Sequence, residues 1–342
     1  MSTTAVPGAG AVPPPLEREN LPEAVAALQA ASDIVLACHV NPDGDTLGCM
    51  LSLGLALEGM GKRVTLLSAD GVPEIYTFMP GVERIERGTE RRDFDLAVVV
   101  DAGDLNRIGA ANRATVEAAP VLMDIDHHVT GGEFGHVRLL DATAAATAEI
   151  VYDLLLALGV RITPPLAENL LCALLTDTGS FRFMNVTPRT FALAGGLMQM
   201  GASPAPIAER VFDNRSFAAQ KLLGRALESL RRNADGSVAW AHVTQADFRE
   251  FGGTDEDTEG IVNAVRAVRG TRAALFLREM PNGKLRVSLR AQDPFDVAAV
   301  AAVFGGGGHR LAAGCTLEGP LAEAEARLVA EVERQMAAGE RP

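Results

Sequence analysis

The stretch DIVLACHVNPDGDTLGCMLSLGLALE, residues 33–58, decides the fold because it reads as a strand, a polar turn and a helix in direct succession. Its first six residues, Asp33–Cys38, form a continuous apolar run that predicts a strand buried on both faces. Thr46–Glu58 predicts a helix, and Asp45 stands where a side chain can cap its amino end. In the turn between them we expect Gly44 to relieve backbone strain. A strand that leads directly into a helix is the repeating unit of a parallel α/β sheet.

The same alternation continues to about Thr190. Short β-branched runs predict further strands, and apolar residues at helical spacing predict helices. The expected strands are Arg63–Leu67, Phe94–Val100 and Val121–Ile125, and the expected helices are Ala144–Leu158 and Pro165–Thr176. This half of the chain therefore predicts an α/β fold, a parallel sheet with helices on both faces.

The second half predicts a smaller α/β domain that follows a helical connector. The connector is Ser203–Arg232, whose prolines lie near its start, where a helix tolerates them. Beyond the turn at Asp235-Gly236 the alternation resumes. The expected strands are Ser237–Val243, Arg272–Glu279, Lys284–Ala291 and Cys315–Leu317, and the expected helices are Thr254–Val268, Pro294–Phe304 and one that starts at Pro320.

The composition is typical of a globular protein that has no membrane span. Hydrophobic residues make up 48% of the chain and charged residues 22%. No uninterrupted apolar run reaches the roughly eighteen residues that a membrane helix requires. The Ala-, Pro- and Gly-rich start of the chain lacks the basic charge and apolar core of a signal peptide, so we expect a mobile tail and a cytoplasmic protein. The four cysteines show no CxxC spacing and predict buried, reduced thiols.

The charge distribution favours short anionic ligands. A formal net charge of −13 argues against non-specific binding to long polyanions, because the mean field repels phosphate. One stretch differs, since seven Lys and Arg residues between Ile261 and Gln292 stand against a single acid, Glu279. An acidic protein with one basic stretch suits a short anionic substrate better than a long one.

Acidic residues and histidines follow several of the predicted apolar runs. Because ligands of open α/β sheets bind at the carboxyl ends of the strands, we expect these side chains to meet at one edge. Their gathering costs free energy through repulsion and lost hydration, which divalent ions can offset. Oxygen and imidazole ligands without thiolate favour Mn²⁺, with Mg²⁺ as the alternative. The residues are His39, Asp43 and Asp45 in HVNPDGD, Asp101 in VVVDAGD, Asp126, His127 and His128 in DIDHHVTG, and Asp177 in LLTDTGSF.

Each of these residues also has an ordinary structural interpretation. A lone Asp after an apolar run, such as Asp45 or Asp177, is more often a helix cap or a turn residue. The clustering favours the functional interpretation, because four of the six histidines fall within these motifs and the later glycine-rich loop. Packing alone does not require such a concentration.

Four ordered motifs resemble those of the DHH phosphoesterases: HVNPDGD, the strand-end Asp101, the DHH at Asp126–His128 and the TDTG around Asp177. The later GGGGHRLAAG resembles the glycine-rich motif of the companion DHHA1 domain. The resemblance covers nearly the whole chain after Glu19. It is strongest to the branch that trims very short oligonucleotides and dephosphorylates 3′-phosphoadenosine 5′-phosphate (pAp). It implies a disordered tail at 1–18, a DHH catalytic domain at 19–195, a helical linker at 196–235 and a DHHA1 substrate-binding domain at 236–338.

The resemblance also implies a role for each site residue. One metal ion would be held by His39 and Asp43, and a second by Asp45, His127 and Asp177. Asp101 would bridge the two ions and serve in catalysis, and His128 would face the scissile phosphate as the second catalytic residue. Two such ions activate water and offset charge on the attacking and leaving oxygens.

The glycine-rich loop is predicted to bind one end of the substrate. Backbone amides that carry no side chain can approach a phosphate closely, and neighbouring side chains add donors. The alternatives are a flexible helix stop for the loop and an ordinary surface arginine for Arg290. After Gly308-His309 this chain has Arg310, where relatives often carry lysine. The positive charge is kept, but the length and the planar fork of the side chain differ. The predicted substrate-binding residues are Gly306, Gly307, Gly308, His309, Arg310, Arg290 and His128.

The aromatic content restricts the substrate length. Few aromatic residues are present to stack successive bases, which disfavours a long single-strand channel. Phe181 and Phe183, close to Asp177, can support one base, although core packing is the better interpretation. The substrates should therefore be short.

The leading functional hypothesis is a Mn²⁺-dependent phosphoesterase that hydrolyses short RNA oligonucleotides to mononucleotides and converts pAp to AMP. A second hypothesis is a phosphodiesterase for linear or cyclic dinucleotides, since the same site would accept them. A third, from another class, is a non-catalytic nucleotide-binding protein, against which the intact set of site residues speaks. We expect no membrane partner, and a homodimer remains an open alternative.

Overall fold

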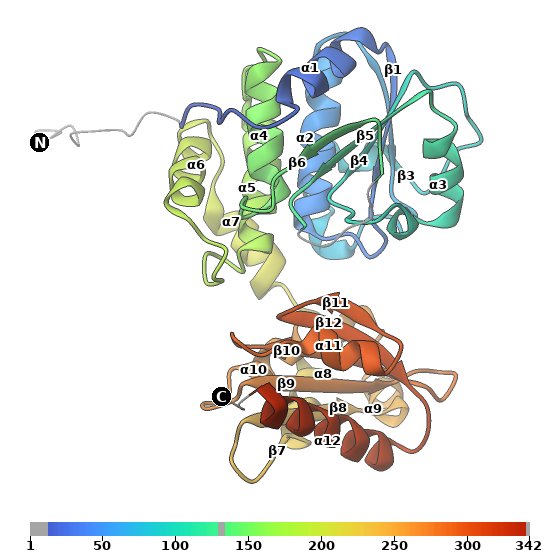
Figure 1. Cartoon of the computed structure of the whole chain (residues 1–342), viewed down its shortest axis with the longest axis vertical. Helices are drawn as coiled ribbons and strands as arrows, with labels where there is room; N and C mark the ends of the chain where they lie inside the picture. The colour runs from blue at the N-terminus through green and yellow to red at the C-terminus, as the bar shows by residue number, and fades with distance from the viewer. Residues whose placement is uncertain (1–12, 129–133, 340–342) are drawn as a thin grey trace, which may run out of the picture. The chain divides into compact units, whose positions relative to one another are not determined.

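The computed structural model describes residues 13–128 and 134–339. The chain divides into two compact units, the first ending at Asn214 and the second beginning at Arg215. Each unit contains its own six-stranded sheet with apolar cores against its faces (Figure 1). We describe each unit separately.

The sheet of the first unit is entirely parallel, as predicted. The strand order is β3-β2-β1-β4-β5-β6. The chain builds outward from β1 to β3 and then returns to place β4 on the other side of β1, so the strand order reverses between β1 and β4. The strands are β1 (Asp33–Cys38), β2 (Arg63–Leu67), β3 (Ile85–Glu86), β4 (Leu96–Val100), β5 (Val121–Asp126) and β6 (Val137–Leu140).

Helices cover both faces of this sheet, which confirms the predicted fold class (Figure 1). Alternate residues of β1 enter opposite cores, Ile34 the core under α2, α4 and α5, and Val35 the core under α3. The helices are α1 (Leu21–Ala30), α2 (Gly44–Gly59), α3 (Ala110–Glu117), α4 (Thr147–Ala157), α5 (Pro164–Asp177), α6 (Pro188–Gln199) and α7 (Pro204–Ala208). Shorter turns are η1 (Glu74–Tyr76), η2 (Val82–Arg84), η3 (Leu105–Ile108) and the π-helical turn η4 (Glu209–Asp213).

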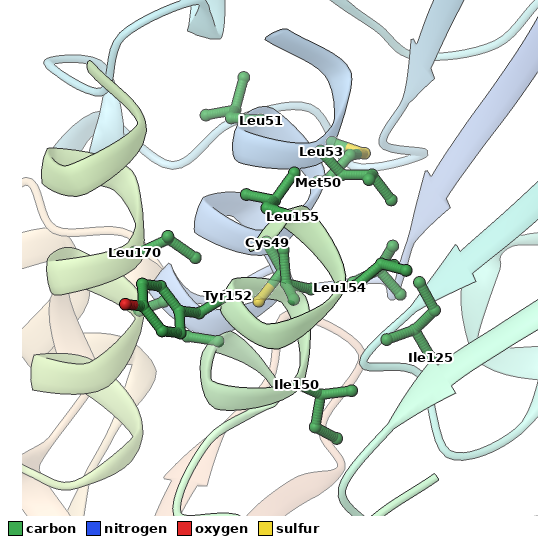
Figure 2. Packing of buried hydrophobic residues seen from close by; sticks show 14 of the residues in the cluster. Cys49, Met50, Leu51, Leu53, Ile125, Ile150, Tyr152, Leu154, Leu155 and Leu170 are labelled. Atoms are coloured by element: carbon green, nitrogen blue, oxygen red, sulfur yellow. The ribbon is translucent and has the colours of Figure 1, made fainter. Parts of the chain in front are cut away.

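The larger core is packed between α2, α4 and α5. Figure 2 shows Cys49 of α2 between Tyr152 and Leu154 of α4, Leu170 of α5 on the side of Tyr152, and Met50 of α2 on the opposite side next to Leu53, with Ile125 of β5 at the sheet. All of these side chains are buried. Because α2, α4 and α5 pack tightly together, the residues at their ends are held in fixed positions, and these ends carry site residues.

Two expectations for the β1–α2 turn are wrong. The side chain that caps α2 belongs to Asp43, which accepts from the backbone N–H of Asp45 at 3.0 Å and of Thr46 at 3.1 Å. Gly44 does not adopt a positive φ, and the positive φ in this turn belongs to Asn41, at 50°. A Cβ on Gly44 would lie 2.5 Å from the side chain of Thr176, so this glycine allows α2 and α5 to approach closely.

The second unit contains a mixed sheet of order β11-β12-β10-β9-β8-β7. The β8–β9 pair is parallel, and the other pairs are antiparallel. The strands are β7 (Arg231–Arg232), β8 (Val238–Val243), β9 (Ala273–Glu279), β10 (Leu285–Ala291), β11 (Gly307–His309) and β12 (Ala312–Leu317). The helices are α8 (Phe217–Glu228), α9 (Gln245–Phe251), α10 (Ile261–Arg266), α11 (Val297–Val303) and α12 (Leu321–Gly339), with the 3₁₀ turn η5 (Glu256–Thr258).

Two of the predicted helical segments are interrupted. The connector Ser203–Arg232 contains α7, the π-helical turn η4, α8 and then strand β7. The expected helix Thr254–Val268 is split into η5 and α10, because Gly260 between them has a φ of 76°. In each case the sequence pattern predicted one continuous helix, and the structure contains several shorter elements in its place.

The N-terminal segment is anchored before residue 19. Arg18, placed at the end of the predicted tail, is buried and pairs with Asp153 at 2.8 Å and with Asp141. Tyr152 donates a hydrogen bond to the carbonyl oxygen of Pro13 at 3.1 Å. The remainder of the predicted tail, residues 1–12, lies outside the described residues.

The described helices include none that is both long enough and apolar enough to cross a membrane.

Candidate metal centre

The candidate site lies at the carboxyl edge of the parallel sheet, where the strand order reverses. His39 directly follows β1, and Asp101 directly follows β4, which pairs with β1. His127 directly follows β5, the next strand along the sheet. The topology therefore brings three of the predicted residues to one place.

The first group of donors consists of His39, Asp43 and Asp101, whose ligand atoms lie within 4.8 Å of one another. His39 donates from Nδ1 to the carbonyl oxygen of Val40 at 2.8 Å, which turns Nε2 toward the carboxylates. This Nε2 is 3.8 Å from Asp43 Oδ1 and 3.8 Å from Asp101 Oδ2. His39 and Asp101 are buried, whereas the Asp43 side chain is 47% exposed.

The second group consists of Asp45, His127 and Asp177, again within 4.8 Å. His127 donates from Nδ1 to the carbonyl oxygen of Ala144 at 3.1 Å. Its Nε2 lies 3.6 Å from Asp177 Oδ2, 4.0 Å from Asp45 Oδ2 and 3.7 Å from Asp101 Oδ1. Asp101 thus presents Oδ2 to the first group and Oδ1 to the second, as a bridging ligand would. Its bridging role stays a prediction.

The amino end of α4 orients two of the carboxylates. Asp45 accepts from the backbone N–H of Thr147 at 2.7 Å and of Ala148 at 3.1 Å. The N-cap residue of α4, Ala146, offers no side-chain acceptor, so Asp45 of α2 caps α4 from outside. Thr147 also donates from Oγ1 to Asp101 Oδ1 at 2.8 Å. One helix terminus therefore fixes one carboxylate from each donor group.

His128 is held by the carboxylate of Asp126. His128 donates from Nδ1 to Asp126 Oδ1 at 2.6 Å, and the same oxygen accepts the backbone N–H of His127 at 2.7 Å. The other oxygen accepts from the backbone of Gly103 at 2.6 Å. Burial alone would raise the pKa of Asp126, but its hydrogen bond with His128 and the charge of that ring lower it. Because Nδ1 is held by Asp126, a contact between His128 and a substrate must use Nε2.

Three other carboxylates of the site, those of Asp45, Asp101 and Asp177, are electrostatically destabilised. Burial, together with neighbouring carboxylates, raises the pKa of Asp45 and of Asp101 well above the ordinary value. Burial also raises the pKa of Asp177 to about 6. Burial alone would lower the pKa of His127, yet the carboxylates of Asp177 and Asp101 outweigh it and raise this pKa. The site therefore gathers more negative charge than its own side chains compensate.

Divalent cations fit these donor sets. The separations of 3.6–4.0 Å between imidazole Nε2 and carboxylate oxygens are too long for hydrogen bonds. They match pairs of ligands that each lie about 2 Å from a shared ion. Both groups offer only carboxylate oxygens and imidazole nitrogens, a set that suits Mn²⁺ or Mg²⁺ better than a thiolate zinc site.

The predicted substrate-binding side chains of the second unit lie on β10 and just after β11. Arg290 is half-buried on β10, where burial lowers its pKa, and its Nη1 donates to the carbonyl oxygen of Leu289 at 3.0 Å. Arg310 is exposed and pairs with Asp293. The side chain of His309 lies outside the described residues. The binding roles of these residues stay predictions.

Two glycines of the glycine-rich loop are required by packing. A Cβ on Gly306 would lie 2.2 Å from the carbonyl oxygen of Gly314, and one on Gly308 would lie 2.6 Å from that of Ala312. Gly308 also has a φ of 142°. The close approach of β11 to β12 therefore demands both glycines. A Cβ on Gly307 would meet no atom within 4 Å, so packing does not explain this glycine.

The structure assigns contacts to residues for which the sequence offered no role. Asp126 was expected at the site only as a member of the DHH motif, and its hydrogen bond with His128 gives it a specific partner. Thr147 gave only the signal of a residue at a helix start. Asn185 donates from Nδ2 to the backbone carbonyl oxygen of Asp177 at 3.1 Å and gave no signal at all. The two phenylalanines near Asp177 are half-buried, and Phe181 packs against the core and stacks on the exposed Phe191 at a centroid distance of 5.1 Å.

Replacing Thr147 with Val should weaken Mn²⁺ binding by about 10- to 100-fold, because Asp101 Oδ1 loses the hydroxyl that orients it. Val keeps the shape of the side chain and the backbone N–H that Asp45 accepts. A Mn²⁺ titration of the purified variant measures the effect. The matched control is Thr143→Val, which removes a hydroxyl bonded to Asp141 at 2.6 Å in the loop before α4. Equal affinities of the two variants would reject an orienting role for Thr147.

The stability gained from Mn²⁺ should increase with pH. The folded protein keeps a proton on Asp177 up to about pH 6, whereas the unfolded chain releases it near the ordinary carboxyl value of 3.8. The metal-free fold binds the extra proton and therefore loses stability as pH rises through this interval. Ion binding requires ionised carboxylates, so added Mn²⁺ should raise Tm slightly at pH 5 and strongly at pH 7.5. Equal increments at both pH values, measured by calorimetry, would contradict this account.

Comparison with known families finds a match in each unit. Residues 33–176 match the DHH family, N-terminal domain, and residues 235–338 match the DHHA1 domain. The first match contains every residue of both donor groups except Asp177, which lies one position beyond it. The second match contains Arg290 and the glycine-rich loop.

The similarity to known proteins covers most of the chain. The bifunctional oligoribonuclease and PAP phosphatase NrnA of Thermus thermophilus is 34% identical over 290 residues, which cover 84% of each chain. The Bacillus subtilis protein of the same name is 25% identical over 299 residues, covering 86% of this chain and 92% of that protein. The crystal structure of an exopolyphosphatase-related protein from Bacteroides fragilis superposes with a TM-score of 0.87 at 26% identity, over 92% of this chain and 96% of that one. Exonuclease RecJ bound to manganese, with a TM-score of 0.55 at 15% identity and 96% of each chain covered, shares the fold.

Proposed function

The chain belongs to the DHH/DHHA1 family of phosphoesterases, and we propose that it is a Mn²⁺-dependent hydrolase of short oligoribonucleotides and of pAp. The observation that carries the proposal is the pair of adjacent donor groups, in which Asp101 belongs to the first group and its Oδ1 lies 3.7 Å from His127 Nε2 of the second. The substrate assignment is supported by the relative named for both activities, to which this chain is 34% identical over most of its length.

The residues of the first unit have distinct tasks in this proposal. His39 and Asp43 hold one ion, and Asp45, His127 and Asp177 hold the other, with Asp101 shared between them. Two bound divalent ions supply an activated water and offset negative charge on the phosphate. Asp126 fixes the ring of His128 through Nδ1, so that Nε2 can contact the phosphate or pass a proton to the leaving oxygen.

The second unit is proposed to bind the end of the substrate. Arg290, Arg310, His309 and the amides of Gly306, Gly307 and Gly308 form the proposed anion site. Gly307 supports the proposed anion site, because packing would allow a larger residue at this position and so does not explain why it is a glycine. Arg290 also supports it, because within the described part of the chain its half-buried guanidinium donates only to the carbonyl group of Leu289 and retains other N–H donors for an anion.

The proposal is tested by comparing substrates under one condition. Di- to pentanucleotide RNA, pAp, linear pApA and cyclic di-AMP are incubated with purified protein and Mn²⁺, and products are separated by chromatography. We expect mononucleotides from RNA and AMP from pAp, and we expect both activities to disappear in chelator. Faster turnover of the dinucleotides than of RNA and pAp would favour the dinucleotide phosphodiesterase. Binding without turnover would favour a non-catalytic nucleotide-binding protein.

A further inference from the structure

Arg107 belongs to the loop that carries Asp101, and it connects this loop to the one that carries His39. It belongs to η3, the 3₁₀ turn that follows β4, and its carbonyl oxygen accepts the backbone N–H of Val40 at 2.6 Å. Its Nη1 donates to the carbonyl oxygen of Ala102 at 3.0 Å, which fixes the guanidinium against the turn after Asp101. The side chain is therefore anchored at the carboxyl edge of the sheet, although it is exposed.

The guanidinium lies beside the pair formed by His128 and Asp126. The position of a Cβ on Gly103 would be 3.5 Å from His128 Cγ, 3.6 Å from Arg107 Nη1 and 3.7 Å from Asp126 Oδ2. All three groups thus surround the same glycine. The Arg107 guanidinium therefore lies on the same side of this glycine as the His128 ring.

Arg107 has no carboxylate partner among residues 13–128 and 134–339. Some other arginines of this unit do have one, since Arg113 donates to Glu117 at 2.8 Å and Arg91 pairs with Asp33 at 2.6 Å, whereas Arg182, like Arg107, donates to a backbone carbonyl group. A guanidinium has five N–H donors, and the single bond to Ala102 uses one of them. The remaining donors are available to an anion.

The charge of the site shows why such a cation matters. The two donor groups contain four carboxylates, from Asp43, Asp45, Asp101 and Asp177. Their ionised charge balances that of two divalent ions, so the filled site would attract an anionic substrate only weakly over distance. Fixed positive charge for the phosphate has to come from side chains that are not ligands. Arg107 is placed to supply it, with the planar fork that suits phosphate oxygens.

We propose that Arg107 is a substrate-binding residue that contacts phosphate oxygens beside His128 within the first unit. This inference rests on the proposed function, because it takes the ligand to be a phosphate ester or phosphomonoester. It adds a phosphate contact that neither donor group provides and that is independent of the anion site proposed for the second unit.

The test compares Arg107→Ala and Arg107→Lys with Arg113→Ala, a control six residues away whose guanidinium pairs with Glu117. We expect Arg107→Ala to lower kcat/KM on dinucleotide RNA by about 10- to 100-fold, the loss typical of one charge-assisted hydrogen bond. Arg107→Lys should recover part of this loss, since it keeps the charge without the fork. Arg113→Ala should match the wild type.

A second readout does not depend on turnover. Equilibrium binding of AMP to the Mn²⁺-loaded protein is measured by calorimetry at several salt concentrations, and Tm is measured for each variant. Arg107→Ala should weaken AMP binding about tenfold or more and reduce its salt dependence, while Tm stays near that of Arg113→Ala. A lowered Tm with unchanged AMP affinity would overturn the inference, because it would show that the bond to Ala102 is only structural.

The two readouts separate this inference from the proposed function. If the wild type cleaves RNA and pAp but Arg107→Ala behaves like Arg113→Ala in both assays, the inference fails and the function stands. If the wild type cleaves neither substrate yet AMP binding drops in Arg107→Ala, the function fails and the phosphate contact stands. Absence of AMP binding and of turnover in the wild type would reject both.

Discussion

Asp101→Asn is expected to lower kcat on dinucleotide RNA by about 10³-fold or more while the fold remains intact. Asp101 turns one oxygen toward each donor group, with Oδ2 3.8 Å from His39 Nε2 and Oδ1 3.7 Å from His127 Nε2. Asn replaces one of these oxygens by an NH₂ group and removes the negative charge. One donor group must then lose its shared ligand, and the affinity for at least one ion falls.

Asparagine is the right substitution because of the backbone at this position. Asp101 has a φ of 57°, and Asn and Asp are the residues that best tolerate this left-handed conformation after glycine. The matched control is Asp104→Asn in the same loop, where the side chain accepts the backbone N–H of Asn106 at 2.7 Å, a task that an amide oxygen also performs. The control should keep wild-type turnover and Mn²⁺ affinity. Ordinary turnover by Asp101→Asn would place the reaction at another centre.

His128→Asn is expected to lower kcat by about 10²- to 10⁴-fold, the range associated with loss of a proton-transfer group, while Mn²⁺ binding changes little. His128 also forms a donor group with Asp101 and His127, but its Nδ1, 3.6 Å from Asp101 Oδ1, is held by Asp126 at 2.6 Å, so we assign it to the phosphate and not to an ion. The Asn oxygen or amide can still meet Asp126, but nothing replaces Nε2 on the far side of the ring. Turnover and Mn²⁺ affinity are therefore expected to separate.

The control for His128 is His136→Asn. The Nδ1 of His136 accepts the backbone N–H of Leu122 at 3.0 Å, and an Asn side chain can accept the same bond. This variant should retain wild-type kcat. Loss of Mn²⁺ affinity in His128→Asn, in step with its loss of activity, would contradict the assigned role and make His128 a ligand instead.

The parallel sheet was predictable because its strands are locally distinct. Asp33–Cys38 and Arg63–Leu67 are short, apolar or β-branched, and bounded by polar turns, and the structure has β1 and β2 at these residues. The elements that the sequence did not reveal depend on tertiary contacts. Strand β3 is two residues long and exists through its pairing with β2, and α10 ends up short because Gly260 interrupts the helical pattern.

The site was predictable as a set of residues but not as a network. Strand ends in a parallel sheet share an edge, so His39, Asp101 and His127 were expected to meet, and they do. The side chains that orient the donors lie elsewhere in sequence. The bond from Thr147 to Asp101 spans 46 positions, and no local pattern indicates it. Asp45 was expected to cap its own helix and instead caps α4 across 102 positions.

Anomalous diffraction from crystals grown with Mn²⁺ tests the central claim most directly. The account predicts two manganese peaks at the carboxyl edge of the first sheet, one against His39 and Asp43 and the other against Asp45, His127 and Asp177, with Asp101 contacting both. A single peak, or peaks that share no contact with Asp101, would contradict it.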